Sequence, residues 1–595
     1  MLERRDAAAR KVVGNVARTR RSSRARATVL LACVALLAGA CGGDGGGGGG
    51  GGTGAGGQPV RGGTLRIVNA ADVDYLDTAN GYYTVTAALQ RTYARGLYSF
   101  DITKRGTPDE LVPVPDLADG PAEVSPDNRV FTFKLRKGVK WAPPVNREVT
   151  AEDFVTAVER LYDKATPSGG QTYGNLIKGA TDFRDGKAKT ISGMVASADT
   201  LTITLDKPAP DFLSVLFQPF FAPVPKEYAA RYKVGSDYSK HVVGSGPYTL
   251  KEYVPTKSIE LIRNTNWDPA TDPLRKAWVD RITVREGLEP DAIQQIIERG
   301  DADLSLDTQP PNAALQRLAT DPKLKQQFAD PISGCIRYLS LGASPKFGAI
   351  SNLKVRQAIQ YAIDKVATQR ARGGTFAGDP ASTILTPTLL GYQKHDTYPT
   401  PNNQGDPAKA RQLLAEAGYP NGLTLSYLGV NTGASKQVDT VVQAALERVG
   451  IKLTVRQLTN SAHYTDELQI PAKRLQHQIG NAGWCPDFAG DGTRSFIVPN
   501  FDGRAILPAG NQNYVELDNP EINAMIDQAL AEPDKAKRGA LWTALDKRLM
   551  QEAVWVPYLY DKSPAFWSER TRNWTFTPWF AQPDLTAIWL NPNTP

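Results

Sequence analysis

The sequence predicts an α/β fold, in which helices pack over sheets. Residues 131–135 and 201–205 alternate apolar and polar side chains, which is typical of half-buried strands. Residues 355–366 instead place apolar side chains three and four positions apart, which predicts one amphipathic helix. Just before Gly450 a predicted helix ends, and an alternating stretch follows at once, which is half of a βαβ crossover. These patterns indicate a scaffold with a large apolar core.

Residues at the expected helix ends support these elements. Thr150 precedes a stretch that begins Ala-Glu-Asp, so we expect a capped helix with acidic residues at its positive end. Asp406 and the proline after it open a second helix that Gly418 ends, because proline favours the first helical position and glycine the position after the last. A third helix ends at Gly450, and the predicted strand at residues 451–455 follows directly.

Charge and motif content exclude several classes of function. Residues 1–40 hold nine of the 69 basic and two of the 62 acidic residues, which leaves 60 of each in the rest of the chain. Such a balance argues against a nucleic-acid partner. The four histidines are scattered without metal-ligand spacing, and no phosphate loop, nucleophile elbow or zinc-protease motif occurs. We expect no metal, no cofactor and no enzymatic activity.

The N-terminal segment predicts export. Basic residues lead into an apolar run at residues 28–37 and then into small residues before Cys41, which resembles a bacterial lipoprotein signal. The run is too short to span a bilayer, which takes about 20 residues. We expect residues 1–40 to be removed, Cys41 to carry lipid and the glycine-rich residues 41–60 to form a flexible tether. An ordinary secretory signal with an incidental cysteine is the alternative. The lipoprotein interpretation places the protein on the outer face of the bacterial cell membrane.

The cysteine count predicts one disulfide. Cys33 would leave with the signal and Cys41 would be lipidated, so only Cys335 and Cys485 remain. Two cysteines in an exported chain indicate a disulfide, and two buried thiols are the alternative.

Short motifs occur in a fixed order along nearly the whole chain after the signal. They are GGTLRI at 62–67, FTFKLRKGVKW at 131–141, VTAED at 149–153, GSGPY at 244–248, KVRQAIQYAID at 354–364, LLAEAG at 413–418 and GWCPDF at 483–488. Together they resemble the extracytoplasmic solute-binding proteins of the peptide/nickel class, which serve ABC importers. The order and spacing of the motifs carry the resemblance, since each motif alone is only moderately specific.

The resemblance implies two lobes joined by a hinge, the type II periplasmic-binding-protein or venus-flytrap fold, with one additional region. Lobe I would take residues 61–95, 246–334 and 566–595, and an inserted region of residues 96–245 would pack on it. Lobe II would take residues 335–565. A ligand would bind in the cleft between the lobes and favour the closed state.

The last motif resembles the segment that lines the ligand cleft in oligopeptide-binding members. By position, Asp487 would bind the α-ammonium group of a peptide and Trp484 would form a wall of the pocket. The backbone around Gly483 and Cys485 would pair with an extended peptide. Where the best-known peptide binders carry a basic residue, this chain has Asn481, which leaves the peptide length open and leaves room for a non-peptide ligand. Alternatively, Asp487 only caps a helix or ends a loop.

The same resemblance pairs Cys335 with Cys485 and implies a function. We expect a monomeric, non-enzymatic receptor that passes oligopeptides to ABC permease subunits in the membrane. The same fold with an oligosaccharide or another small solute is the first alternative, and a cell-wall hydrolase is the second.

Overall fold

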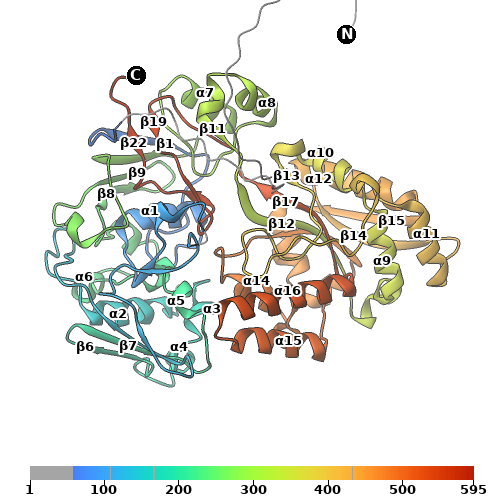
Figure 1. The fold of residues 1–595 in the computed structure, drawn as a ribbon, viewed down its shortest axis with the longest axis horizontal. Coiled ribbons are helices and arrows are strands. Elements are labelled where there is room, and N and C mark those ends of the chain that lie inside the picture. The colour runs from blue at the N-terminus through green and yellow to red at the C-terminus, as the bar shows by residue number, and fades with distance from the viewer. Residues whose placement is uncertain (1–57, 108, 165–167, 432, 595) are drawn as a thin grey trace, which may run out of the picture. The chain divides into compact units, whose positions relative to one another are not determined.

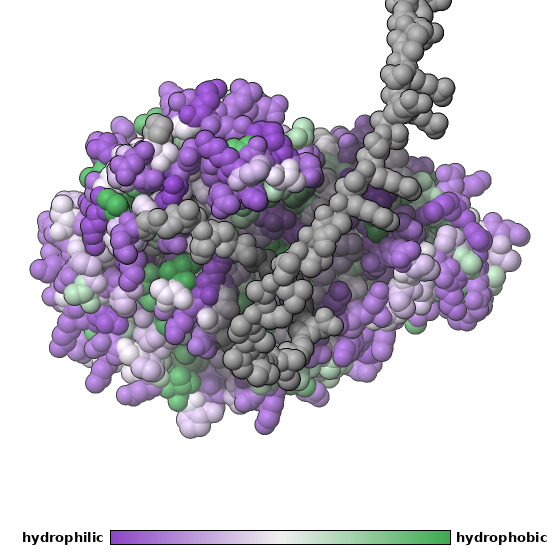
Figure 2. All heavy atoms as spheres, turned by 45° about the horizontal axis from the view of Figure 1, so that its top comes forward, coloured by the Kyte–Doolittle hydropathy of each residue, from purple (hydrophilic) through white to green (hydrophobic). Residues whose placement is uncertain are grey.

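A computed structural model describes residues 58–594, apart from positions 108, 165–167 and 432. The expected signal, Cys41 and the tether up to residue 57 lie outside the described residues. Within the described part of the chain, no helix combines the length and the apolar character needed to cross a membrane. The face shown in Figure 2 is mostly hydrophilic, with small apolar groups scattered over it.

The first sheet, which defines lobe I, has four strands in the order β1-β10-β9-β8. β1 and β10 are parallel, and the other neighbours are antiparallel. Its apolar residues form a core with tryptophans from the C-terminal segment, including Trp567 and Trp574. The strands are β1 (Thr64–Val68), β8 (Tyr248–Val254), β9 (Ser258–Arg263) and β10 (Arg281–Arg285), and the helices near them are α1 (Thr84–Tyr93), α7 (Pro290–Glu298) and α8 (Asn312–Thr320).

The second sheet defines the inserted region and is fully antiparallel, in the order β4-β5-β7-β6. The predicted alternation is confirmed, because Phe131 and Phe133 of β5 are buried beside Leu201 and Ile203 of β7. A reciprocal capping box with Thr150 begins the predicted helix. The elements are β4 (Glu123–Val124), β5 (Val130–Lys134), β6 (Met194–Ser197), β7 (Thr200–Thr204), α2 (Ala151–Leu161) and α5 (Phe212–Val215).

The third sheet defines lobe II and has six strands in the order β13-β17-β12-β16-β14-β15. β14 runs parallel to β15 and β16, while the other pairs are antiparallel. The predicted half-crossover is present as β14-α12-β15. The strands are β12 (Ile332–Leu341), β13 (Gly378–Asp379), β14 (Leu423–Val430), β15 (Ile451–Leu458), β16 (Ile479–Trp484) and β17 (Trp555–Lys562).

Helices cover both faces of this sheet (Figure 1). Ile336 and Tyr338 of β12 belong to one core, with apolar residues of α14–α16, whereas Leu339 and Leu341 belong to another, with residues of α9, α11 and α12. The apolar stripes of the sequence therefore build the scaffold. The helices are α9 (Leu353–Ala362), α10 (Lys365–Arg372), α11 (Pro407–Glu416), α12 (Gly433–Glu447), α14 (Thr493–Phe501), α15 (Pro520–Ala531) and α16 (Lys535–Glu552).

The prediction of one continuous helix over residues 355–366 is wrong, because two helices cover this range. The structure divides it into α9 and α10, because Asp364 leaves the helix and accepts a hydrogen bond from the Ala367 backbone at 2.8 Å. An N-capping aspartate stabilises a new helix start. The apolar stripe continues across the break, so the pattern alone did not reveal it.

Two connections between the lobes lie side by side. β11 (Phe328–Ala329) pairs with β18 (Ala565–Phe566), just before β12 and just after β17. β12 itself runs across residues 334 and 335, and β18 across residues 565 and 566. The expected boundaries between lobe I and lobe II, at 334/335 and 565/566, therefore fall inside β12 and β18, and they remain a prediction. Short pairs complete the topology: β2 (Tyr98–Ser99) with β3 (Val114–Pro115), β19 (Thr571–Arg572) with β22 (Trp589–Leu590), and β20 (Phe576–Thr577) with β21 (Gln582–Pro583).

Candidate functional site

A disulfide and a backbone ladder link strand β12 to the end of strand β16, close to the connections between the two lobes. The structure contains a disulfide between Cys335 and Cys485, the pair that the resemblance implies. Next to it, Ile336 lies opposite Trp484, and Arg337 lies opposite Gly483. The GWCPDF motif is therefore held in register with the first residues of lobe II.

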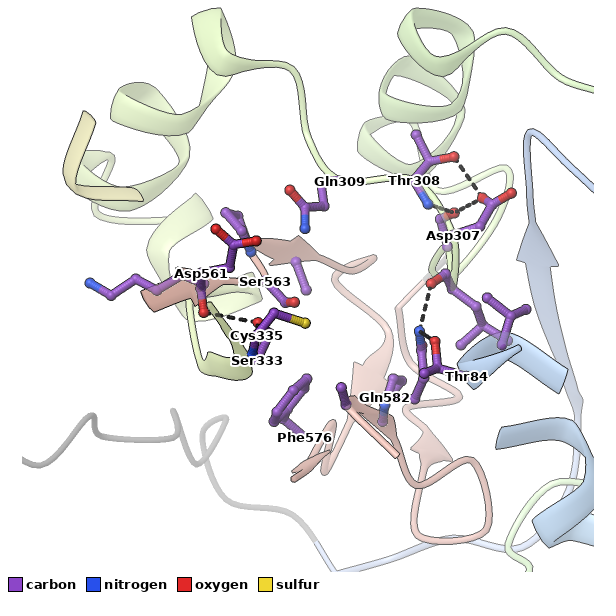
Figure 3. A pocket seen from close by; sticks show the side chains of 18 of the residues that line it. Thr84, Asp307, Thr308, Gln309, Ser333, Cys335, Asp561, Ser563, Phe576 and Gln582 are labelled. Carbon is purple, nitrogen blue, oxygen red and sulfur yellow. Dashed lines mark hydrogen bonds between the residues drawn. The ribbon is translucent and has the colours of Figure 1, made fainter. Parts of the chain in front are cut away.

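A cleft of about 650 Å³ opens beside this disulfide (Figure 3). One wall comes from lobe I and includes the start of α1, the end of α7 and residues 305–310 between α7 and α8, and the other comes from β12, β17 and the disulfide. Its volume falls in the range of sites for drug-sized ligands. The lining includes Tyr82, Tyr83, Ile297, Asp307, Gln309, Cys335, Arg337, Cys485, Pro486, Asp561, Lys562, Trp574, Phe576 and Gln582.

Most of the charged groups of the cleft already have partners. Asp307 accepts hydrogen bonds from the Ala71 backbone at 2.7 Å and from the Thr308 hydroxyl at 2.6 Å. Lys562 lies 3.3 Å from Asp379 and also pairs with a second carboxylate. The protein therefore satisfies Asp307 with hydrogen bonds and Lys562 with ion pairs, without a ligand.

Aromatic surfaces form the apolar part of the cleft. Trp574 and Phe576 belong to the lobe I core but line the cleft with one side. Tyr83 also lines the cleft and is 60% exposed. An exposed aromatic ring beside polar groups offers a stacking surface to a ligand.

Asp487 lies at the edge of this cleft, where lobe II meets lobe I. Its neighbours Cys485 and Pro486 line the cleft, and its Oδ1 accepts a hydrogen bond of 2.6 Å from the Tyr82 hydroxyl, which comes from the opposite wall. Gln218 of the inserted region donates to the Asp487 backbone oxygen at 3.4 Å. Among the described residues, no basic side chain forms an ion pair with this half-buried carboxylate.

The surroundings of Asp487 favour its neutral form. Burial raises the pKa of the Asp487 carboxyl, and the hydroxyl groups of Tyr173, Tyr82 and Ser495 oppose part of the rise. The ring of the next residue, Phe488, is buried in the core of the inserted region. A positive group from a ligand would stabilise the charged carboxylate in this setting.

Asn481, Trp484 and Gly483 are not among the described residues that line the cleft. Asn481 is 5% exposed, and both ends of its amide are used, since it donates to Asp439 at 2.7 Å and accepts from Tyr558 at 2.9 Å. Trp484 packs half-buried against the core of lobe II. The backbone of Gly483 donates to the Tyr464 hydroxyl at 3.0 Å.

Of the five predicted ligand-binding residues, Cys485 is the one that lines the described cleft. The ligand roles of all five stay predictions. Sequence reasoning did not find Tyr82, Arg337 or Asp561. Arg337 follows Cys335 by two positions, so the disulfide pairing offered the one signal that could have located it.

Comparisons with known proteins agree with this architecture. A model of the bacterial extracellular solute-binding proteins, family 5 Middle, matches residues 112–500. Heme-binding protein A of Haemophilus influenzae is 30% identical over 479 residues, with 77% of this chain and 80% of that protein covered. Glutathione-binding protein GsiB of Escherichia coli K12 is 26% identical, with coverages of 87% and 90%.

Solved structures show the same fold. Clavulanic acid biosynthesis oligopeptide binding protein 2 superposes with a TM-score of 0.82 and 33% identity, with coverages of 89% of this chain and 96% of that one. The binding protein DppA of Helicobacter pylori, in complex with the peptide STSA, superposes with a TM-score of 0.68. At 24% identity and coverages of 89% and 98%, this second likeness concerns the fold alone.

Proposed function

Because the chain belongs to the bacterial extracellular solute-binding proteins of family 5, which serve ABC importers, we propose that it captures short oligopeptides for import. Asp487 carries this proposal. It is a half-buried carboxylate at the edge of the interlobe cleft, it meets a hydroxyl from the opposite wall, and no described basic residue pairs with it. A charge that leaves water without a partner is costly, so the site is suited to a cation supplied by the ligand.

The α-ammonium group of a peptide would be that cation. It would bind Asp487 through a charge-assisted hydrogen bond, while the Tyr82 hydroxyl would keep or yield its place on the same carboxylate. Contacts with both walls favour the closed arrangement of the lobes, and ligand binding shifts the population by its difference in affinity for the two states. The closed, monomeric protein would then dock on the permease.

Calorimetric titration of a tripeptide and of its N-acetylated form tests this role. Replacing Asp487 by Asn should lower the affinity for the free peptide about 10- to 100-fold, which corresponds to the loss of one charged hydrogen bond. The affinity for the acetylated peptide should change little. Asp527→Asn is the matched control, because Asp527 is an exposed carboxylate on α15 of the same lobe. Equal affinities of Asp487→Asn and the wild type for the free peptide would remove the proposed role.

We also propose that the protein is anchored to the membrane by lipid on Cys41 after removal of residues 1–40. The wild type expressed in bacteria should enter the detergent phase on phase partition and should begin at Cys41 in mass spectra, with the added mass of a lipid. Cys41→Ala should stay in the aqueous phase. A wild type that stays in the aqueous phase would contradict the anchor and favour an ordinary secretory signal.

A non-peptide solute is the second candidate, and the aromatic rings of Tyr83 and Trp574, which both line the cleft, favour it. Flat ligands and sugars stack on such surfaces. Native mass spectrometry of the freshly purified protein distinguishes the candidates, since a retained ligand reveals its mass.

A further inference from the structure

Among the described residues, Arg337 is held in its orientation by one nitrogen of its guanidinium group. Its Nε donates to Asp561 Oδ2 at 2.6 Å, which joins the neighbouring strands β12 and β17. The side chain is 29% exposed and lines the interlobe cleft. The hydrogen bonds found among the described residues use this Nε and neither Nη1 nor Nη2.

The glycine opposite Arg337 makes room for this orientation. A Cβ atom at Gly483 would lie 2.5 Å from Nη1, 2.9 Å from Cδ and 3.0 Å from Cζ of Arg337. The guanidinium group therefore rests against the bare backbone of β16. The Tyr464 hydroxyl accepts a hydrogen bond from the Gly483 backbone, so the surface beneath Arg337 is itself fixed.

The charged groups of Lys562 and Asp307, which also line the cleft, already have several partners within the protein. Lys562 pairs with Asp330 and Asp379 and donates to the Thr375 backbone oxygen. Asp307 accepts several hydrogen bonds from its own loop and from the segment after β1. Arg337 thus differs from them, because a carboxylate fixes its Nε, the side chain lines the cleft, and its Nη atoms have no hydrogen-bond partner among the described residues.

We propose that Arg337 binds a carboxylate group of the ligand through Nη1 and Nη2, so that the cleft selects ligands with a free carboxylate. Two parallel bonds from a guanidinium group match the geometry of a carboxylate. The inference rests on the proposed function and makes it more specific, since a peptide would be held at both charged ends.

The spacing of the two charged sites limits the length of the peptide. Arg337 lies against Gly483, and Asp487 follows four positions later along the same chain segment. Four residues span at most about 14 Å when fully extended. Peptides of about two to four residues fit this separation and the cleft volume of about 650 Å³.

A tripeptide and its C-terminal amide test the proposal, because they differ only in the carboxylate. The wild type should bind the free acid about 30- to 100-fold more tightly than the amide, or about 2–3 kcal/mol. Arg337→Gln should remove this preference and leave the affinity for the amide within about threefold. Arg504→Gln, which removes one charge from an exposed ion pair in lobe II, should keep the preference.

Gly483→Ala provides a second variant that leaves Arg337 in place. The new methyl group displaces a flexible side-chain end, so the protein should fold, as circular dichroism would verify, and should lose the preference for the free acid. Equal binding of acid and amide by the wild type, or an unchanged preference in Arg337→Gln, would overturn the proposal while peptide binding itself stands. Binding of neither peptide by the wild type would overturn the proposed function and this inference together.

Discussion

Removal of the Cys335–Cys485 disulfide should destabilise lobe II strongly. The two cysteines are 150 positions apart, so the bond closes a large loop in the unfolded chain. The loop-entropy relation gives about 17 cal/mol/K for such a loop, or about 5 kcal/mol at 25 °C. The expected loss of unfolding free energy is therefore about 3–5 kcal/mol, since measured losses often fall below the loop-entropy value.

The native fold should survive this change. Beside the bond, Ile336 pairs with Trp484 and Arg337 with Gly483 in the ladder between β12 and β16, and β12 also pairs with β17. These backbone hydrogen bonds remain after the sulfur atoms are gone. The effect should therefore arise mainly in the unfolded state, and the folded double variant should give an unchanged circular dichroism spectrum.

Urea unfolding of the wild type and of the double variant Cys335→Ala/Cys485→Ala measures the effect. The wild type should also lose stability in dithiothreitol without prior unfolding, because Cys485 is exposed to solvent. A matched double variant at Ser351 and Thr440, which are polar surface positions of lobe II, should unfold as the wild type does. A loss below about 1 kcal/mol in the cysteine variant would refute the loop-entropy reasoning.

Two further predictions concern buried charges. Burial and the neighbouring Asp72 carboxylate raise the pKa of Glu286 to about 9, well above that of an unfolded glutamate. Between pH 5 and 8 the folded protein therefore keeps a proton that the unfolded chain loses, so the free energy of unfolding should fall as pH rises, by at most about 1.4 kcal/mol per pH unit. Glu286→Gln should flatten this slope in thermal melts, and an unchanged slope would contradict the assignment. Arg494 donates two hydrogen bonds of 2.6 and 2.8 Å to buried Asp211. Arg494→Gln should cost about 3–5 kcal/mol in urea unfolding, and adding Asp211→Asn should recover part of it.

Local elements were predictable because their patterns are local. The alternation at residues 131–135 and the capping threonine Thr150 identify β5 and α2, since burial of one face and satisfaction of the first helical N–H groups depend on adjacent residues. The division between α9 and α10 was missed, because Asp364 acts as a cap without interrupting the apolar stripe. The pattern of burial and the path of the backbone are separate properties.

The cleft was less predictable, because its contacts join distant parts of the chain. Tyr82 and Asp487 are 405 positions apart, and Arg337 and Asp561 are 224 apart. Nothing near Tyr82 in the sequence marks it as a partner of a carboxylate. The resemblance located one side of the cleft through the GWCPDF motif, but the opposite wall follows only from the folded arrangement.

The glycine of this motif shows how the register of a sheet adds meaning to a sequence pattern. Along the chain, Gly483 indicates a backbone that a ligand could approach closely. Across the sheet, its missing side chain is also the space that Arg337 occupies. A larger residue would displace the guanidinium group and would also cover the backbone, so both proposed roles favour glycine at this position. The amide and acid forms of a single peptide separate them, because only the Arg337 role depends on the ligand carboxylate.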